Sequence, residues 1–262
     1  MRSIPGTILI ALLWSAGLSA VPAQAETTCP GTDSDIATDR PDVTNSSLVV
    51  PAGSLQSENG INLTARGSAR VVDGTNSRLR LGVASCLELL LDLPTYFGAL
   101  RGRAASGFSN VAPAVKWQVG PLPGDIDLSV TAGIGLTTGT TRVAGHGAQP
   151  YVQLPWSREL GDGWGISGMV TAFFFPSESK AKLTTEPTLV LEKALGGRAD
   201  VFIEYVGDYP AHARPSHLFN SGGAYRLTPA QQIDLHVGFG LNNAAPSYVL
   251  GVGYSIRIDG LF

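Results

Sequence analysis

The chain has 262 residues, a formal net charge of −3 and only 15% charged residues, and its mean hydropathy is +0.14. No cluster of basic residues stands out, so the composition argues against a nucleic-acid partner. The low charge and the 32 glycines favour an outer-membrane barrel over a secreted β-sandwich, which is the alternative fold at this stage.

The first 25 residues are typical of an export signal. Arg2 supplies a positive start, and the apolar run over 8–21 is too short to span a bilayer. Ala23, Gln24 and Ala25 form a small-x-small cleavage site. We therefore expect cleavage after Ala25 and a location in the bacterial outer membrane; a single-pass anchor is the alternative.

Residues 26–53 are irregular in pattern and are expected to be a periplasmic segment that precedes the barrel. Alternating segments then follow one another to the C-terminus, and no apolar run is long enough for a membrane-spanning helix. The expected strands are 55–66, 78–83, 87–93, 111–119, 126–136, 152–156, 164–175, 185–193, 201–208, 219–227, 233–241 and 248–258. They predict an all-β fold, a transmembrane antiparallel β-barrel over 54–262 with about twelve strands. A count of ten or fourteen stays open.

The connections between these strands alternate in length. Tight turns are expected near 84–86, 120–125, 161–163, 195–198 and 228–231. Longer loops are expected near 72–77, 94–106, 138–147, 176–183, 209–216 and 242–246. Short periplasmic turns and longer external loops are typical of bacterial outer-membrane barrels, so both termini are expected in the periplasm.

The last strand carries the clearest alternation and ends on an aromatic residue. Tyr254, Ile256 and Ile258 share one face, and Phe262 closes the chain. Because lipid tolerates no unpaired strand edge, we expect this strand to pair with the first one. Its pattern also resembles the signal that outer-membrane proteins present to their assembly machinery, which we expect as a partner beside outer-membrane lipid.

Aromatic residues gather near the strand ends, as in the interfacial girdles of membrane barrels. The expected periplasmic belt contains Trp117, Trp156, Trp164, Tyr225 and Phe262. The expected external belt contains Phe97, residues 173–175, Tyr205, Phe219, Phe239 and Tyr248.

The same alternation assigns the polar residues of the strands to the lumen, while Leu128, Val130, Ile134, Val237 and Val252 face lipid. The expected lumen lining is Glu58, Arg80, Glu88, Lys116, Asp127, Glu192, Glu204, Asp234, His236 and Arg257. Two interpretations stay open: a packed polar network that stabilises the barrel, or a weakly acidic lining that selects permeants. Twelve strands enclose less space than the sixteen of open porins, so a narrow or plugged conduit is expected.

A short motif precedes the first strand. Thr38, Asp39, Arg40, Pro41 and Asp42 are followed by Val50, Pro51, Gly53, Leu55, Gln56 and Glu58. This stretch resembles the start of a bacterial family described as the putative MetA-pathway of phenol degradation, often labelled simply transporter. The hairpin with Arg80, Gly82, Leu87 and Glu88 is similar as well, and departs from the family at Cys86. The resemblance implies an outer-membrane barrel linked to uptake of aromatic or other small organic compounds.

The polar motif is also a candidate plug. Asp39, Arg40 and Asp42 are expected to enter the periplasmic mouth and to pair with wall charges such as Arg80, Glu88 or Arg257. Cys29 and Cys86 both lie on the oxidising periplasmic side, so a disulfide between them would tether this segment. Two unpaired thiols are the alternative, because sequence gives no distance.

No constellation for catalysis or metal binding is apparent in the sequence. His146, His212 and His217 fall in expected loops, His236 lies on a strand wall, and no serine has a nucleophile-like context. We expect no enzyme activity, no cofactor and no metal. The expected function is passive passage of a small organic solute; the alternative is a structural or adhesive barrel with a closed lumen.

Overall fold

A computed structural model of the chain describes residues 29, 35–176 and 182–262. The proposed leader and its cleavage site after Ala25 lie outside these residues. The strands are β1 (Leu55–Arg66), β2 (Ala69–Ala84), β3 (Leu87–Asp92), β4 (Tyr96–Arg101), β5 (Gly107–Phe108), β6 (Ala112–Leu122), β7 (Ile126–Gly135), β8 (Gln149–Gly161), β9 (Trp164–Phe175), β10 (Lys182–Leu195), β11 (Ala199–Pro210), β12 (Ser216–Thr228), β13 (Gln231–Gly240) and β14 (Tyr248–Ile258). One short helix, α1 (Thr141–Ala144), lies between β7 and β8. No helix among the described residues is long and apolar enough to cross a membrane.

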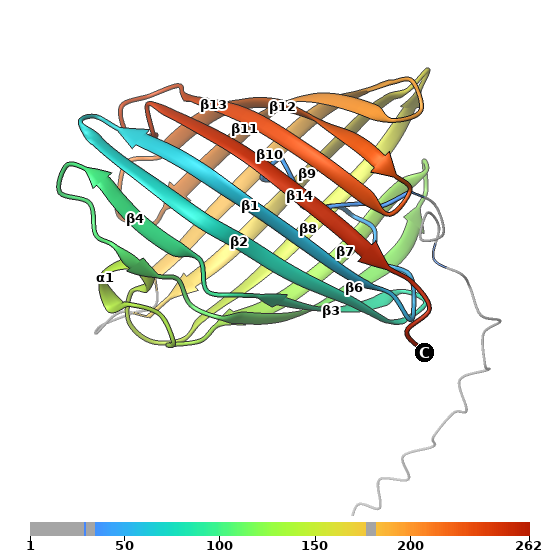
Figure 1. Cartoon of the computed structure of the whole chain (residues 1–262), viewed down its shortest axis with the longest axis horizontal. Helices are drawn as coiled ribbons and strands as arrows, with labels where there is room; N and C mark the ends of the chain where they lie inside the picture. Colours follow the sequence, from blue (N-terminus) through green and yellow to red (C-terminus); the bar gives the residue numbers. More distant parts are fainter. Residues whose placement is uncertain (1–28, 30–34, 177–181) are drawn as a thin grey trace, which may run out of the picture.

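The sheet closes on itself. Strand β1 pairs in antiparallel register with β2 on one side and with β14 on the other, from Leu55 opposite Ile258 to Ala65 opposite Tyr248. The other strands connect β2 to β14 around the wall through antiparallel pairings, so the predicted twelve-stranded antiparallel barrel is confirmed (Figure 1). Closure leaves no open edge and satisfies the backbone hydrogen bonds that lipid cannot satisfy.

The structure contains fourteen strand segments because two wall strands are interrupted. Residues 78–84 of β2 pair with β3, and residues 70–74 of the same strand pair with β4. Residues 93–95 separate β3 from β4, and they include Pro94, which has no N–H to donate to a ladder. Segment β5 likewise continues β6 beyond a short break.

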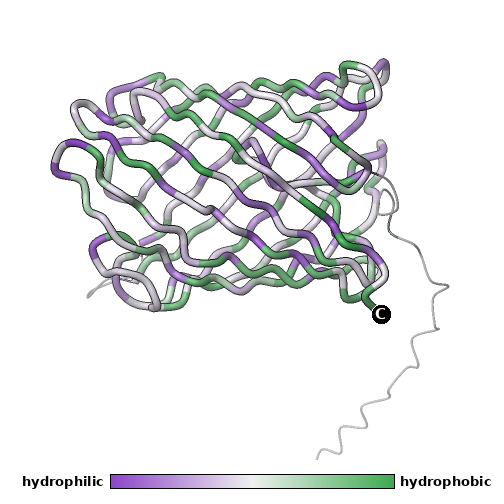
Figure 2. Tube along the Cα trace, in the orientation of Figure 1, coloured by the Kyte–Doolittle hydropathy of each residue, from purple (hydrophilic) through white to green (hydrophobic). Residues whose placement is uncertain are grey.

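The barrel is apolar outside and polar inside. Along β7, Ser129 and Thr131 are buried against the interior, whereas Leu128 and Val130 lie on the outer face between them. On β14, Val252 is 59% exposed to the outside, while Ser255 is fully buried. The hydropathy of the chain alternates along the strands in the same way (Figure 2).

Two expected loops are instead strand. Residues 72–77 belong to β2, and only Gly67 and Ser68 separate β1 from β2. Within this part of β2 the Asp73 carboxylate accepts hydrogen bonds from Asn62 on β1 (3.0 Å) and from Asn76 (2.6 Å). The expected loop over 94–106 contains β4.

The short turns β2–β3, β6–β7, β8–β9, β10–β11 and β12–β13 lie at one end of the barrel, together with the C-terminus (Figure 1). We call this the periplasmic end, since outer-membrane barrels keep their short turns there. The opposite end is called external.

Candidate functional site

The interior of the barrel holds residues 36–50, which we call the lumen segment. At its start the Ile36 N–H donates to the carbonyl of Pro229 in the β12–β13 turn (2.7 Å). At its end the Val50 N–H donates to the Glu88 carboxylate on β3 (2.7 Å). Ile36, Val49 and Val50 are buried, so the lumen segment is a packed part of the interior.

Asp39 anchors the lumen segment to one wall. Its carboxylate lies 2.9 Å from Arg78, 3.3 Å from Arg80 and 3.6 Å from Lys116. Burial alone would raise the pKa of Asp39, but the attraction of Arg80, Lys116 and Arg78 outweighs it and holds the pKa below the usual range of a carboxyl. Asp39 is therefore ionised at neutral pH, beside three cationic side chains.

Arg80 holds two parts of the lumen segment at once. Its side chain is 0% exposed and forms ion pairs with Glu58 (3.0 Å) and Glu88 (3.0 Å). It also donates to the backbone carbonyls of Ala37 (3.0 Å) and Leu48 (2.9 Å). A planar guanidinium suits this task because it presents five donors in a rigid fork.

Glu204, on the opposite wall, binds the middle of the lumen segment. Its carboxylate accepts hydrogen bonds from the N–H groups of Val43 (3.0 Å) and Thr44 (2.9 Å) and from the Thr44 hydroxyl (2.8 Å). The Asn220 amide donates to the same carboxylate (2.9 Å). The lumen segment is thus fixed to β11 as well as to β2 and β3.

Asp42 does not form the ion pair expected for it. The ion pairs among the described residues include Asp39 and Arg40 but not Asp42. Burial raises the pKa of Asp42, and the nearby carboxylates of Glu204 and Glu192 raise it further. The sequence predicted only that the three charged residues pair with wall charges such as Arg80, Glu88 or Arg257; Asp39 lies 3.3 Å from Arg80, whereas Asp42 lies near other carboxylates.

Arg40 points toward the β13–β14 wall. Its guanidinium lies 3.3 Å from the Asp234 carboxylate and donates to the carbonyl of Val252 (3.4 Å). A Cβ atom at Gly60 or Gly253 would overlap the Arg40 side chain, so glycine at both positions makes room for it. Arg40 therefore completes the attachment of the lumen segment to the wall.

The lumen segment divides the interior into two cavities. The lower cavity, at the periplasmic end, has a volume of about 450 Å³ and is lined by Glu192, Asp200 and Arg226 beside the segment itself. The upper cavity, at the external end, has a volume of about 950 Å³. Arg40 and Asn45 line both cavities, so the partition is thinnest at these two residues.

The upper cavity has one aromatic wall. Tyr151 on β8 and Phe173 and Phe175 on β9 line it, and the centroids of neighbouring rings are 6.1 Å apart. Residues 173–175 were expected in the external girdle as a group, but only Phe174 lies on the outer face, where it is 40% exposed. Strict alternation within this run would have separated Phe174 from its two neighbours.

The remaining predicted lining residues occupy different places. His236 hydrogen-bonds Asn220 (3.1 Å) and Asn62 (3.3 Å) across the lumen wall. Glu192 lines the lower cavity, whereas Asp127, the second residue of β7, lies near the periplasmic end and lines neither cavity. Arg257, a predicted partner of the lumen segment, pairs with Asp259 at the periplasmic end (2.8 Å).

Within the predicted motif, the Thr38 hydroxyl donates to the Arg40 carbonyl (2.6 Å) and accepts a hydrogen bond from Gln232 (2.9 Å). Pro41 lines the lower cavity.

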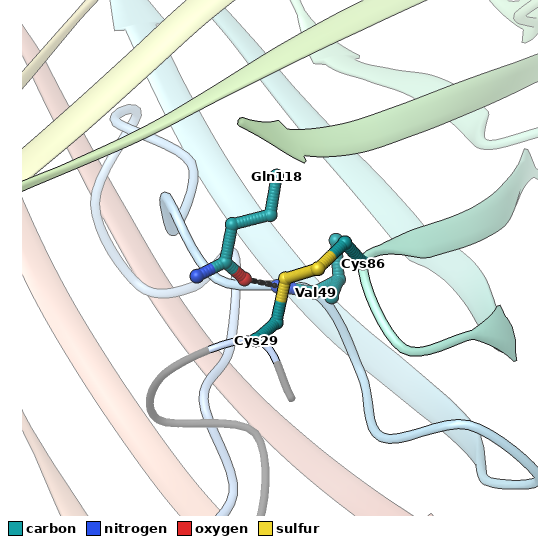
Figure 3. Close-up of a disulfide and its surroundings, with 4 residues drawn as sticks. All are labelled: Cys29, Val49, Cys86 and Gln118. Atoms are coloured by element: carbon teal, nitrogen blue, oxygen red, sulfur yellow. Dashed lines mark hydrogen bonds between the residues drawn. A yellow bond between two sulfur atoms is a disulfide. The ribbon is translucent and has the colours of Figure 1, made fainter. Parts of the chain in front are cut away.

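Cys29 and Cys86 form a disulfide, with their Cα atoms 5.4 Å apart (Figure 3). Cys86 lies in the β2–β3 turn at the periplasmic end. Close to the disulfide, the Val49 N–H donates to the side-chain oxygen of Gln118 on β6 (3.1 Å; Figure 3). The disulfide therefore ties Cys29 to the turn near which Val49, close to the end of the lumen segment, is bound.

Sequence reasoning missed several uncharged contacts of the lumen segment. Asn45 donates to Gln153 on β8 (3.0 Å), and Ser47 bonds Ser157 on the same strand (2.7 Å). Alternation places Gln153 and Ser157 on the inner face of β8, but nothing in the pattern favours these amide and hydroxyl groups over the charged residues as contacts. In the part of the chain that the structure describes, no group of three or more His, Cys, Asp and Glu side chains could hold a metal ion.

The fold is similar to solved outer-membrane channels. The COG4313 outer membrane channel from Pseudomonas putida F1 matches with a TM-score of 0.64 and 14% identity, covering 81% of this chain and 98% of that one. The NanC porin matches with a TM-score of 0.57 and 7% identity, covering 78% of this chain and 100% of that one. The KdgM porin in complex with disordered oligogalacturonate matches with a TM-score of 0.51 and 7% identity, covering 79% and 99%.

Among curated proteins, none matches the chain in sequence. A family model described as "Putative MetA-pathway of phenol degradation" matches residues 38–258, from the motif that begins the lumen segment to the last residue of β14. The chain therefore belongs to this family.

Proposed function

We propose that the protein is an outer-membrane channel for passive passage of small, uncharged organic solutes, aromatic ones above all. The observation that carries this proposal is the upper cavity, about 950 Å³ in volume, with Tyr151, Phe173 and Phe175 on one wall. The two most similar folds described above are named a channel and a porin, and the family is described by phenol degradation. Both favour permeation over catalysis.

The charges of the upper cavity favour an uncharged solute. Asp39, Arg78 and Asp92 line its floor and wall, and Arg78 lies 2.9 Å from Asp39 and 2.6 Å from Asp92. Charges that neutralise one another provide polar contacts without attracting a net anion or cation. An aromatic ring that carries hydroxyl groups fits such a cavity, because its faces can stack and its edge can hydrogen-bond.

The outer surface of the barrel supports a location in the outer membrane. The outward side chains are apolar over the height of the barrel, as contact with lipid requires. We place the periplasmic end inside the cell envelope, with export directed by the leader that ends at Ala25. The C-terminal strand with Tyr254, Ile256, Ile258 and Phe262 is the signal that we propose for the assembly machinery.

In this proposal the lumen segment, which is part of the N-terminal segment 26–53, is the plug that controls passage. Asn45 lines both cavities, and its side chain hydrogen-bonds Gln153 and Arg78 of the wall. We expect Asn45→Ala to raise single-channel conductance in a planar bilayer. Asn76→Ala is the control, because Asn76 lines the upper cavity but not the lower one. Equal conductance of the Asn45 variant and the wild type would contradict a plug at this residue.

The aromatic wall can be tested by solute selectivity. Vesicles containing the protein would be given a neutral dihydroxybenzene and an aliphatic diol of similar size, and the ratio of their influx rates measured. The double variant Phe173→Ala and Phe175→Ala is expected to lower this ratio roughly three- to tenfold, the equivalent of one lost aromatic pair. Phe174→Ala, which changes the outer face of the same strand, should leave the ratio unchanged. An unchanged ratio in the double variant would overturn the proposed solute class.

A further inference from the structure

Three arginines without an acidic partner gather at the external end of the barrel. Arg70 lies near the start of β2, Arg101 ends β4, and Arg103 follows two residues later. None of the three takes part in an ion pair with any residue that the structure describes. Gly102 packs directly against Ala69, where an added Cβ would approach its Cα to 2.8 Å, so the chain that bears Arg101 and Arg103 lies beside Arg70.

The backbone register aligns two of these arginines with an aromatic residue across four strands. Ala65 on β1 is the partner of Tyr248 on β14 and of Arg70 on β2, and Arg70 is in turn the partner of Arg101 on β4. The Arg70 guanidinium reaches over the small Ala65 and lies 5.3 Å from the centroid of the Tyr248 ring. Ala65 is completely covered as a result.

This row faces the membrane and not the conduit. Tyr248 shares the outer face of β14 with Leu250 and Val252, and Leu100, next to Arg101, is 65% exposed. None of the three arginines lines the upper cavity. Leu100 and Tyr248 therefore meet the apolar part of the outer leaflet, and the guanidinium groups lie at the level of its headgroups.

Like charges directly opposite one another across two strands repel, so Arg70 and Arg101 destabilise the bare protein. A phosphate between them would turn this repulsion into attraction, because guanidinium and phosphate form short, bidentate, charge-assisted hydrogen bonds. Cation–π contact with Tyr248 holds the Arg70 plane in place for such a ligand. We propose that Arg70, Arg101 and Arg103 form a binding site for the phosphate of an outer-leaflet glycolipid headgroup.

The test uses the full-length protein, purified in a non-ionic detergent. Its thermal unfolding midpoint would be followed while diphosphorylated lipid A, dephosphorylated lipid A or inorganic phosphate is added, since a ligand that binds only the folded state raises the midpoint. We expect the phosphorylated lipid to raise the midpoint and the dephosphorylated lipid to have little effect. Equal stabilisation by both lipids would overturn the site, and full stabilisation by inorganic phosphate would show a free-anion site in its place.

Variants of the arginines test whether lipid A binds at this site. Arg70→Ala with Arg101→Ala is expected to weaken lipid A binding about tenfold or more, as the loss of a hydrogen bond between charged groups predicts. Lys193→Ala is the matched control, because Lys193 stacks on Trp164 at the periplasmic end (4.9 Å) and should not change lipid A binding. Arg70→Lys with Arg101→Lys keeps the charge but loses the bidentate geometry, and is expected to bind with intermediate affinity. Wild-type affinity in both double variants, or an equal loss in the Lys193 variant, would contradict the proposal.

Discussion

Arg80 shows how a single residue can hold a membrane barrel and its contents together. It is fully buried, it neutralises Glu58 and Glu88, and it binds two backbone carbonyls of the lumen segment. Buried ion pairs are costly to break, because removal of one partner leaves the other charged in a place that water does not reach. The residue thus couples the wall of the barrel to the segment that crosses it.

We expect Arg80→Met to lower the free energy of unfolding by about 3–5 kcal/mol, as for other broken buried pairs. Denaturant unfolding in lipid vesicles measures this loss. Arg158→Met removes an exposed arginine near the periplasmic end of β8 and should cost far less. A similar small cost for both variants would mean that Arg80 is dispensable for stability.

Asp42 and Asp39 should respond to pH in opposite directions. The folded protein raises the pKa of Asp42 above its ordinary value of 3.8, so folding binds a proton, and stability is lost as the pH rises from that value through the raised pKa. The pKa of Asp39 is lowered, so its contribution is present above 3.8 and is lost as the pH falls through the lowered pKa.

Denaturant unfolding at a series of pH values tests both signs. Asp42→Asn is expected to stabilise the protein at neutral pH, by an amount that shrinks toward pH 3.8, the ordinary value of the carboxyl. Asp39→Asn is expected to destabilise it at neutral pH, since Arg78, Arg80 and Lys116 lose their shared anion. A destabilising Asp42→Asn at neutral pH would show that its carboxylate is well solvated or paired.

At the scale of the element, successive residues of each strand alternate between the lipid-facing side and the interior of the barrel. Along β7, Val130 faces outward, while its neighbour Thr131 faces inward opposite Lys116 on β6. The Lys116 ammonium has no hydrogen-bond partner among the described residues, although Asp39 and Glu88 lie 3.6 and 3.5 Å away. A carboxylate introduced at one of these two adjacent positions is therefore expected to affect the stability of the fold differently from one introduced at the other.

Val130→Asp should destabilise the folded barrel by about 2 kcal/mol, because it places a carboxylate in lipid. Thr131→Asp places the same carboxylate beside Lys116 and should cost less or stabilise the fold. Unfolding in lipid vesicles compares the two variants directly. Equal costs would contradict the assignment of the two faces of β7.

The elements also show what sequence can and cannot predict. The bounds of β1, β9 and β14 follow from alternation between turn residues, which is a local property of the chain. Residues 72–77 were predicted to be a loop, because local composition does not reveal that Asn62 hydrogen-bonds Asp73 across the β1–β2 pair. The contact of Thr44 with Glu204 joins residues 160 positions apart, and parity says only that both face the interior.

For the molecule as a whole, the property that the sequence predicts best is that the outer face is apolar and the interior polar, the reverse of a water-soluble protein. Low charge, many glycines and the alternation of apolar and polar residues predict a sheet that closes on itself with an apolar exterior. The pairing of β1 with β14 confirms the closure. The partition into two cavities depends instead on where residues 36–50 bind, which no repeating pattern encodes.

Assembly is a property of the whole chain, and Phe262 is where we expect it to be sensed. Its side chain is 78% exposed, while the neighbouring Leu261 N–H donates to the carbonyl of Gly53, just before β1 (2.8 Å). Deletion of Phe262 should therefore slow insertion into the outer membrane without changing the conductance of the molecules that do insert. Fractionation of cell envelopes measures the first effect, and Phe262→Trp should restore normal levels. Unchanged outer-membrane levels after the deletion would contradict a role in assembly.

The disulfide between Cys29 and Cys86 also determines how the molecule carries mechanical load. The bond joins positions 57 residues apart, and the covalent ring that it closes contains the lumen segment, β1 and β2. Tension applied to the chain ahead of Cys29 passes through the sulfur atoms to the β2–β3 turn and so into the sheet. The lumen segment lies outside that force path while the bond is intact. Reduction of the bond would reroute the same tension through the lumen segment, whose contacts with the wall begin at Ile36 and Asp39.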